Sequence, residues 1–384
     1  MPNMKDQQDF HSQRIIQMGK TGSINRRSIL TGLAAGGAAG LASPAIVKAD
    51  EAIIWKMPMS WPKQVPGVGI NGVRFAERVN QMSGGRLTIK VFGAGELVPP
   101  LEVFDAVATG AAEIGHATPY YWQGKDQAFH FFTGVPFGLT QIEHAAWLRF
   151  GGGQALWEKA YEPFGVTPFY AGSSGTQAGG WFAKELTSLE DFKGLKMRIA
   201  GLGGEVLRRL GASVVMLPPT DIFAALQTGT IDAAEWVGPW NDLAFGLYKV
   251  VGNYYMPAFH ELGAALEIIV NTEKLMALPE DLQAIIKAAA QATSFETMAD
   301  FAYNNAASLG PLMEKKGVTV RSLPDDMTMA LAKESAIVTQ ELADNSPLAG
   351  EIYKSFVDFR AISSRYVMQS EWEALRTRKM ALEL

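Results

Sequence analysis

Segments with a strand-like alternation of apolar and polar residues take turns with segments that carry apolar residues at helical spacing. Residues 51–59 (EAIIWKMPM) and 87–97 (LTIKVFGAGEL) have the strand pattern, and residues 73–82 (VRFAERVNQM) between them have the helical one. A further helical segment at 101–111 leads to a short apolar strand at 113–120. This order predicts an α/β fold in which mostly parallel sheets are flanked by helices.

A second run of the same kind follows a helical stretch that begins at Gln141. Its predicted strands are 165–174, 181–186, 194–201, 213–218 and 231–239. Residues 261–275 contain an apolar strand that should cross between the two runs, and the chain from Pro279 onward is mainly helical, with long C-terminal helices. The two runs predict two α/β lobes. The predicted boundaries are 50–145 with about 237–272 for lobe 1, 146–236 with about 273–345 for lobe 2, and 346–384 for a C-terminal helical segment.

The first 49 residues have the composition of a signal peptide. The basic pair Arg26–Arg27 precedes a Gly/Ala-rich apolar region, and Val47 and Ala49 suit the small residues before a cleavage site. The arginine pair favours the twin-arginine export route, although the motif around it is imperfect. A basic patch before an uncleaved segment is the alternative. We expect the mature protein to lie outside the cytoplasm of a bacterium, in the periplasm.

Composition narrows the classes of partner and chemistry. The 384 residues carry a net charge of −5 and no cluster of basic and aromatic residues, which argues against nucleic acid as a partner. The chain has no cysteine, which excludes thiolate nucleophiles and Cys-ligated zinc or iron–sulfur clusters. The G-x-S-x-G, P-loop and EF-hand motifs are absent, and the five histidines show no metal-ligand spacing.

Arg198 is the first candidate for binding a ligand. It lies in a predicted strand, and the glycine-rich stretch 201–205 (GLGGE) follows it closely. Glycines let the backbone approach a ligand, and the helix that begins there favours an anion at its N-terminus. A planar guanidinium can hold a carboxylate through two parallel hydrogen bonds. A solvent-facing strand arginine is the alternative.

Glu235 and Gln177 are candidate ligands of a cation. Glu235 lies at the end of a strand of small and apolar residues, where ligands bind in open α/β sheets, and Trp236 follows it. Gln177, which lies among glycines, could supply a neutral oxygen. Such a set would suit a hard cation such as Na⁺ or Ca²⁺, with Glu261 as a further candidate ligand. A surface glutamate is the alternative for Glu235.

Two loops that follow predicted strands could border a ligand site. The glycine loop 93–97, which contains Glu96, could bind an anion, but a tight turn explains it better. Tyr120, Tyr121 and Trp122 follow another strand and could form the wall of a pocket. Packing of these aromatic residues on a surface loop explains them about as well.

Five segments carry a resemblance to a known family. They are 91–110 (VFGAGELVPPLEVFDAVATG), 120–126 (YYWQGKD), 175–182 (GTQAGGWF), 194–211 (GLKMRIAGLGGEVLRRLG) and 229–239 (GTIDAAEWVGP). With them the chain resembles the periplasmic solute receptors of TRAP (tripartite ATP-independent periplasmic) transporters, the DctP-like family, over nearly all of the length after the signal peptide. The combination is similar to the branch that binds 2-oxo or 2-hydroxy acids such as pyruvate, 2-oxobutyrate or lactate.

The resemblance implies a two-lobed, hinge-closing receptor with a periplasmic-binding-protein-like fold. In such a receptor Arg198 pairs with the carboxylate of the substrate. The resemblance also implies a metal cation whose coordination the bound ligand completes. Its protein ligands would be Gln177, both oxygens of Glu235, the backbone oxygen of Trp236 and Glu261.

The same resemblance adds expectations about the rest of the binding site and about partners. The loops at Glu96 and at Tyr120–Tyr121 should close over the site from the other lobe. Ser173 is an expected contact of the substrate, but the family position near it often carries an Asn, so we expect this local contact to differ here. In that branch the C-terminal helix is exchanged between subunits, which implies a homodimer, and the small and large membrane subunits of the transporter are separate chains.

Two other classes of function fit the residues. One is an exported enzyme, a hydrolase or lyase of small organic acids with Glu235 as a base. The other is a periplasmic sensor or partner protein that uses the same fold without a transporter. A receptor would return its ligand chemically unchanged, and an enzyme would not.

Overall fold

A computed structural model describes residues 52–383, apart from the side chain of Lys315. Residues Asp50–Leu384 cluster as one compact unit. The predicted signal peptide and its Arg26–Arg27 pair lie outside the described residues.

The strands of the described residues form three sheets. β1 (Ile53–Pro58) and β2 (Leu87–Phe92) are a parallel pair, and β10 (Ala265–Asn271) lies between β3 (Ile114–Ala117) and β4 (Val166–Ser173) in the second sheet. The third sheet has six strands in the order β11 (Thr319–Arg321), β9 (Asn253–Tyr255), β5 (Gly180–Phe182), β8 (Ala233–Ala234), β6 (Lys196–Arg198) and β7 (Ser213–Val215). We call the first two sheets lobe 1 and the six-stranded sheet lobe 2, with the helices that pack on each.

The predicted α/β class, with sheets flanked by helices, is confirmed. The expectation of mostly parallel sheets is not, because β10 is antiparallel to both β3 and β4, and β5 is antiparallel to both β8 and β9. Parallel neighbours require a long crossover connection. The chain instead enters β5 and β10 by short connections from the other lobe, at residues 174–179 and 256–264. The lobe boundaries predicted from the sequence, between residues 145 and 146 and between residues 236 and 237, lie elsewhere in the chain than these crossings.

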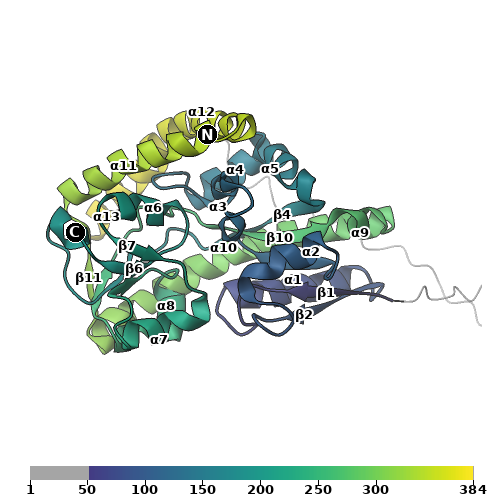
Figure 1. The fold of residues 1–384 in the computed structure, drawn as a ribbon, viewed down its shortest axis with the longest axis horizontal. Coiled ribbons are helices and arrows are strands. Elements are labelled where there is room, and N and C mark those ends of the chain that lie inside the picture. The colour runs from purple at the N-terminus through teal and green to yellow at the C-terminus, as the bar shows by residue number, and fades with distance from the viewer. Residues whose placement is uncertain (1–51, 384) are drawn as a thin grey trace, which may run out of the picture. The chain divides into compact units, whose positions relative to one another are not determined.

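Helices flank these sheets, and the C-terminal helices pack mainly on other helices (Figure 1). In chain order they are α1 (Val68–Met82), α2 (Val103–Ala108), α3 (His130–Thr133), α4 (Gln141–Phe150), α5 (Gly153–Tyr161), α6 (Leu202–Arg209), α7 (Ile222–Gln227), α8 (Pro239–Phe245), α9 (Thr272–Met276), α10 (Glu280–Lys316), α11 (Asp325–Asp344), α12 (Pro347–Val367) and α13 (Glu373–Leu382). A π-helical turn, η8 (Met368–Trp372), joins α12 to α13. The predicted helical C-terminal region is therefore confirmed.

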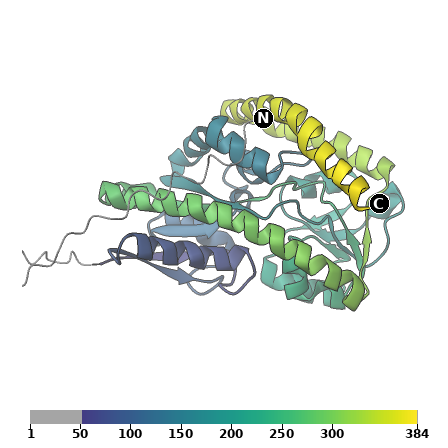
Figure 2. The ribbon, with the colours of Figure 1, turned by 180° about the vertical axis from the view of Figure 1, so that it is seen from behind.

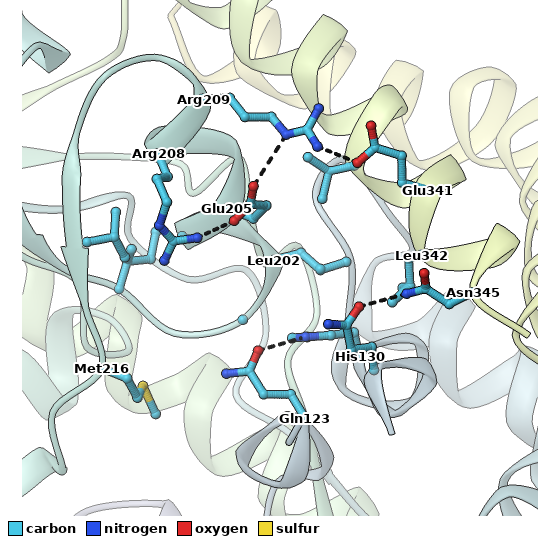
Figure 3. A pocket seen from close by; sticks show the side chains of 16 residues that line it. Gln123, His130, Leu202, Glu205, Arg208, Arg209, Met216, Glu341, Leu342 and Asn345 are labelled. Carbon is cyan, nitrogen blue, oxygen red and sulfur yellow. Dashed lines mark hydrogen bonds and ion pairs between the residues drawn. The ribbon is translucent and has the colours of Figure 1, made fainter. Parts of the chain in front are cut away.

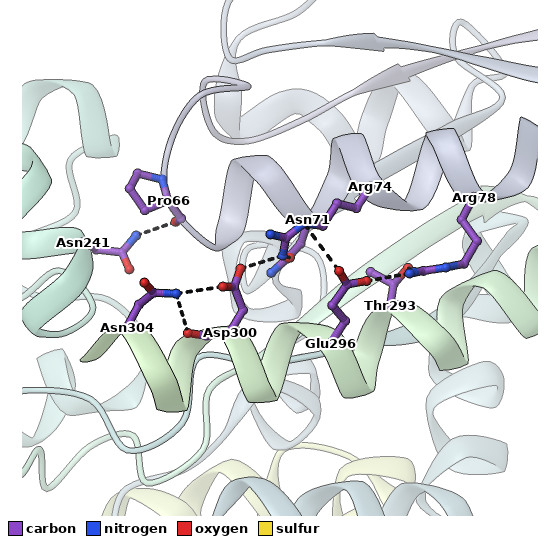
Figure 4. A network of polar contacts seen from close by, with 9 residues as sticks. All are labelled: Pro66, Asn71, Arg74, Arg78, Asn241, Thr293, Glu296, Asp300 and Asn304. Atoms are coloured by element: carbon purple, nitrogen blue, oxygen red, sulfur yellow. Dashed lines mark hydrogen bonds and ion pairs between the residues drawn. The ribbon is translucent and has the colours of Figure 1, made fainter. Parts of the chain in front are cut away.

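The 37-residue helix α10 runs behind the molecule and packs on β4 and α1 of lobe 1 and on α8 of lobe 2 (Figure 2). Its contact with α1 includes two arginine–carboxylate pairs (Figure 4). Arg74 donates to Asp300 at 2.6 Å, and Arg78 donates to Glu296 at 2.5 Å. These side chains are partly buried, so water screens the pairs less than it would at a free surface. Helix α10 is thus anchored to both lobes.

Glu267 is a fully buried carboxyl group in β10. The Trp122 indole donates to it at 2.7 Å and the Tyr161 hydroxyl donates at 2.9 Å. Burial disfavours the charged form and raises the pKa of Glu267 to about 8, although both hydrogen bonds act in the opposite direction.

We predict that stability falls as the pH rises, and that Glu267→Gln reduces this fall. Below the unfolded pKa, Glu267 is protonated in both states, whereas between that value and about 8 only the unfolded state releases the proton. For a pKa shift of this size, the free energy of unfolding falls by up to about 5 kcal/mol across this pH range. Urea unfolding at pH 5 and pH 8 measures it. An equal pH dependence in the variant and the wild type would contradict the assignment.

Candidate functional site

Arg198 and Glu235 form an ion pair that is removed from water. Arg198 is the last residue of β6 and Glu235 follows the neighbouring parallel strand β8, where the Glu235 amide donates to the Arg198 carbonyl at 2.9 Å. Arg198 Nη1 donates to Glu235 Oε2 at 2.7 Å and to the Glu235 carbonyl at 2.5 Å. Both side chains are 1% exposed. The predicted ends of these two strands therefore meet at one edge of the sheet, as parallel pairing requires.

A buried ion pair seldom stabilises a protein by itself, because removing two charges from water is costly. The pair here leaves donor capacity unused. Arg198 Nε donates to the Leu217 carbonyl at 3.3 Å, whereas Nη2 has no hydrogen bond to a described protein group. The guanidinium carbon lies 5.7 Å from the ring centroid of Trp236. Arg198 can thus donate to one further oxygen beside an aromatic wall.

Several buried oxygens around this pair have no hydrogen-bond donor. They are Gln177 Oε1, Glu235 Oε1 and both carboxylate oxygens of Glu261. Ligand atoms of Glu235, Glu261 and His260 lie within 4.8 Å of one another. Buried oxygens without donors are costly, and two carboxylates this close repel each other. Oxygen-rich sets of this kind are the ones that hard cations prefer.

The pKa of the Glu261 carboxyl reflects this crowding. Burial raises it well above its ordinary value, and the neighbouring Glu235 carboxylate raises it further. Arg198 and the Tyr120 hydroxyl act in the opposite direction. The donor set therefore fits a cation, which would supply the positive charge that these oxygens lack.

Gln177 and Glu261 lie in two of the three segments that cross between the lobes, the third being α10 between β10 and β11. The Gln177 amide donates to the Glu261 carbonyl at 3.2 Å, which joins the crossings directly. The Gln177 side-chain amide donates to Ser174 Oγ at 2.9 Å, while its Oε1 has no partner. Gln177 is thus held by its backbone and its side chain, and Glu261 by its backbone.

Aromatic residues of lobe 1 cover the cluster. Tyr120 and Tyr121 lie in the turn η2 (Pro119–Trp122), with ring centroids 5.2 Å apart. With Trp61, Gln177 and Trp236 they line a cavity of about 20 Å³. Burial raises the pKa of the Tyr121 hydroxyl to about 12, and it raises the pKa of the Tyr120 hydroxyl well above its ordinary value. Both hydroxyls therefore stay protonated and can donate. A space of this size holds about one water molecule, so a solute can enter only when the lobes move apart.

Comparisons with known proteins identify the family. The family model of the bacterial extracellular solute-binding proteins, family 7 (DctP), matches residues 60–345. The chain belongs to this family. A monocarboxylate 2-oxoacid-binding periplasmic protein of Nostoc sp. is 42% identical over 306 residues, which cover 80% of this chain and 84% of the relative. The family consists of solute-binding proteins, which decides against the enzyme alternative.

Solved structures of similar chains have the same fold. A TRAP periplasmic solute-binding protein of Colwellia psychrerythraea, with bound calcium and pyruvate, is 36% identical with a TM-score of 0.83, and the match covers 85% of this chain and 100% of that one. A TRAP periplasmic solute-binding protein of Pseudoalteromonas atlantica, with bound sodium and pyruvate, is 35% identical with a TM-score of 0.83, over 85% and 99% of the two chains. No helix within residues 52–383 of this family member has the length and apolar character needed to cross a membrane.

The structure of this solute-binding protein brings most of the predicted site residues together. Those that meet around the buried ion pair are Arg198, Gln177, Glu235, Trp236, Glu261, Tyr120 and Tyr121. Ser173 is buried at the end of β4, where its Oγ accepts from the Gly175 amide at 3.1 Å. Ser174 rather than Ser173 holds Gln177.

Glu96 does not join the site. Its side chain is 46% exposed, pairs with Lys63 at 2.7 Å and accepts from the Gly93 amide at 3.0 Å. Gly95 in this loop has a φ of 77°, which favours glycine. The tight turn that was the alternative for residues 93–97 is therefore what the structure contains.

His260 is a site residue that sequence reasoning missed. It is 1% exposed, its Nε2 lies 3.9 Å from Glu235 Oε1, and neither ring nitrogen has a hydrogen-bond partner. Gly203 in α6 makes room for it, since a Cβ there would lie 2.5 Å from the His260 Cβ. The only signal in the sequence was its position next to Glu261. A single histidine in an apolar stretch forms no metal-ligand motif, because such motifs are recognised by the spacing of two or more ligands.

A larger pocket of about 390 Å³ lies beside α6 and α11 (Figure 3). Its charged side chains neutralise one another, since Arg208 pairs with Glu205, and Arg209 pairs with both Glu205 and Glu341. It is larger than the cavity beside Tyr120, Tyr121 and Trp236, but it offers a charged solute no unpaired ionic group among its described lining residues.

We predict that Ca²⁺ stabilises the chelator-treated protein and that Glu261→Gln removes this effect. Saturation at a hundredfold excess over Kd is worth about 3 kcal/mol. Without Ca²⁺ the variant should be more stable than the wild type, because one of two neighbouring carboxylates is gone. Thermal unfolding with and without Ca²⁺ measures both effects.

Glu267→Gln is the matched control for this experiment, since Glu267 is equally buried but lies outside the cluster. It should keep the stabilisation by Ca²⁺. A wild-type response in Glu261→Gln would remove Glu261 from the cation site.

Proposed function

We propose that this chain is the periplasmic receptor of a TRAP transporter that captures a small 2-oxo or 2-hydroxy monocarboxylate together with Na⁺ or Ca²⁺. Pyruvate, 2-oxobutyrate and lactate are the solutes of this class. The observation that carries the proposal is the buried Arg198–Glu235 pair beside unpaired oxygens of Gln177, Glu235 and Glu261. The relative from Nostoc and the two pyruvate-bound structures support the same class of solute.

Arg198 is the proposed partner of the solute carboxylate. Its Nη1 is engaged by Glu235, which fixes the plane of the guanidinium, and its free Nη2 donates to the solute. Because the group is held in place before the solute arrives, little side-chain entropy is lost on binding. The tyrosine hydroxyls of η2 supply neutral donors from the opposite lobe.

Gln177 Oε1, both oxygens of Glu235, the Trp236 backbone oxygen and Glu261 would hold the cation. With Arg198 and both carboxylates ionised, the protein groups sum to one negative charge, and the solute carboxylate adds a second. A bound cation supplies the compensating charge in a place that water does not reach. The oxygens alone would repel the solute, so we expect the solute to bind weakly without a cation.

Lobe closure completes the binding cycle in this proposal. The solute enters when the lobes separate and becomes enclosed when Tyr120 and Tyr121 return over Arg198. Apparent affinity then depends on the fraction of closed protein as well as on the contacts. Delivery goes to the separate small and large membrane subunits of the transporter. The protein is exported to the periplasm, and Arg26–Arg27 in the signal peptide favour the twin-arginine route.

We predict that Arg198→Lys weakens pyruvate binding at least tenfold in the presence of saturating Ca²⁺. Lysine keeps the charge opposite Glu235 but lacks the fork that reaches two partners at once. Calorimetry of the chelator-treated, Ca²⁺-reloaded protein gives the affinity, and mass spectrometry should recover the pyruvate unchanged. The exposed Arg208→Lys is the control and should bind as the wild type does. Wild-type affinity in Arg198→Lys would contradict its role, and chemical conversion of pyruvate would contradict the receptor.

We propose further that the C-terminal segment 346–384 pairs two copies of the chain by exchange of its last helix. Large apolar side chains of α12, η8 and α13 are exposed, among them Ile362 at 71%, Tyr366 at 69% and Trp372 at 55%. Exposed apolar groups spaced along one helical segment are typical of an association surface. Lobes bounded by the crossings at 174–179 and 256–264 would remain intact in each copy.

We predict that Tyr366→Glu with Trp372→Glu converts a dimer into a monomer, because charges replace the apolar contacts. Light scattering of the purified protein measures the mass. Met276→Glu, which changes an equally exposed apolar residue on α9, is the control and should leave the mass unchanged. A monomeric wild type, or a dimer in the double variant, would overturn the pairing.

A further inference from the structure

Asp242 is a fully buried carboxylate that joins three separate segments of lobe 2. It lies in α8, and its Oδ2 accepts from the Trp181 indole at 2.9 Å and from the Tyr254 hydroxyl at 2.8 Å. Its Oδ1 accepts from the Val237 amide at 3.3 Å. Trp181 belongs to β5, Tyr254 belongs to β9, and Val237 follows β8. One side chain therefore holds three neighbouring strands together.

Each of these segments carries a proposed cation ligand. Val237 directly follows Glu235 and Trp236, Trp181 lies in β5 four residues after Gln177, and Tyr254 precedes the crossing that contains Glu261. The hydrogen bonds of the Asp242 side chain therefore hold all three segments at residues close in sequence to their proposed cation ligands.

The three segments also contact one another near Asp242. The Val237 carbonyl accepts from the Ala178 amide at 3.0 Å, so the residue that Asp242 holds in turn fixes the neighbour of Gln177. The Trp181 and Tyr254 rings stack with centroids 4.2 Å apart. A shift of Asp242 would thus be transmitted along bonded neighbours to the Gln177 oxygen and to the Trp236 carbonyl.

We propose that Asp242 is the positioning residue of the cation site: it binds neither the solute nor the cation, but fixes the spacing of the oxygens that do. The inference rests on the proposed function. A cation site demands a set separation between ligand oxygens, and these oxygens come from three segments that the Asp242 carboxylate bonds at once. Groups that orient metal ligands from behind typically change metal affinity by about 10- to 100-fold when they are replaced.

Glu267 shows what a merely structural buried carboxylate would do. It is as buried as Asp242 and accepts two hydrogen bonds from a Trp and a Tyr, but its partners Trp122 and Tyr161 belong to lobe 1. Removing either carboxylate costs stability through unsatisfied buried donors. Glu267 lies in β10, just after the crossing that contains Glu261, but neither of its partners lies on a segment with a cation ligand. Asp242 is bonded to all three segments that carry cation ligands, so its loss should weaken cation binding far more than the loss of Glu267.

The test compares Asp242→Asn with Glu267→Gln in Ca²⁺ titrations of the chelator-treated protein by calorimetry. Asparagine keeps the size of the side chain but replaces one acceptor oxygen by a donor. We expect Asp242→Asn to weaken Ca²⁺ binding at least tenfold and Glu267→Gln to leave it within about twofold. Pyruvate affinity at saturating Ca²⁺ should stay near that of the wild type, since Arg198 is untouched.

Tyr254→Phe removes one donor to the same carboxylate and serves if Asp242→Asn does not fold. It should weaken Ca²⁺ binding in the same direction by a smaller factor. The inference is overturned if the variants that fold bind Ca²⁺ as the wild type does, or if Glu267→Gln weakens binding equally. If the wild type does not bind Ca²⁺, the same titrations are made with Na⁺. Failure of the wild type to bind either cation would instead refute the proposed function, which separates the two outcomes.

Discussion

The arrangement of this protein depends on the cost of placing Arg198 and Glu235 out of water. An isolated charge in such a place would be intolerable, and a pair is tolerated only when hydrogen bonds surround it. Parallel pairing of β6 with β8 brings the two residues to one edge, where backbone and side-chain bonds join them. The pair still leaves oxygens of Glu235 and Glu261 without donors. This incompleteness distinguishes a binding site from a structural ion pair.

Most of the site could be predicted from the sequence because strand ends in α/β folds are conspicuous. Arg198 and Glu235 each stand at the end of a short apolar strand with a glycine three residues further on. Those local features marked both residues as candidates, and the resemblance to the family divided their expected roles. Glu96 looked similar, since it also follows a strand and lies among glycines. Its turn carries it to a surface lysine, and nothing local distinguishes a turn that folds outward from one that folds over a site.

Other features could not be found without the tertiary structure. Asp242 is an ordinary acidic residue in an amphipathic segment, and only the approach of β5 and β9 reveals its partners. His260 had no spacing partner in the sequence. The crossings at 174–179 and 256–264 were misplaced because helix-to-strand alternation marks elements but not the sheet that each strand joins. The sheet that a strand joins is decided by pairing between residues far apart in the sequence, and such pairing leaves no periodic pattern in the sequence.

The crossings have a consequence for how binding and motion are linked. Gln177 and Glu261 lie within two of the segments that connect the lobes, and a bond between their backbones ties the two segments together. Any rotation of one lobe against the other must change backbone angles within these segments and within α10, which also connects the lobes. A ligand that requires their oxygens at fixed positions therefore works against rotation, and by thermodynamic reciprocity rotation works equally against that ligand. In the proposed function, two of the segments that connect the lobes are therefore also segments that bind the cation.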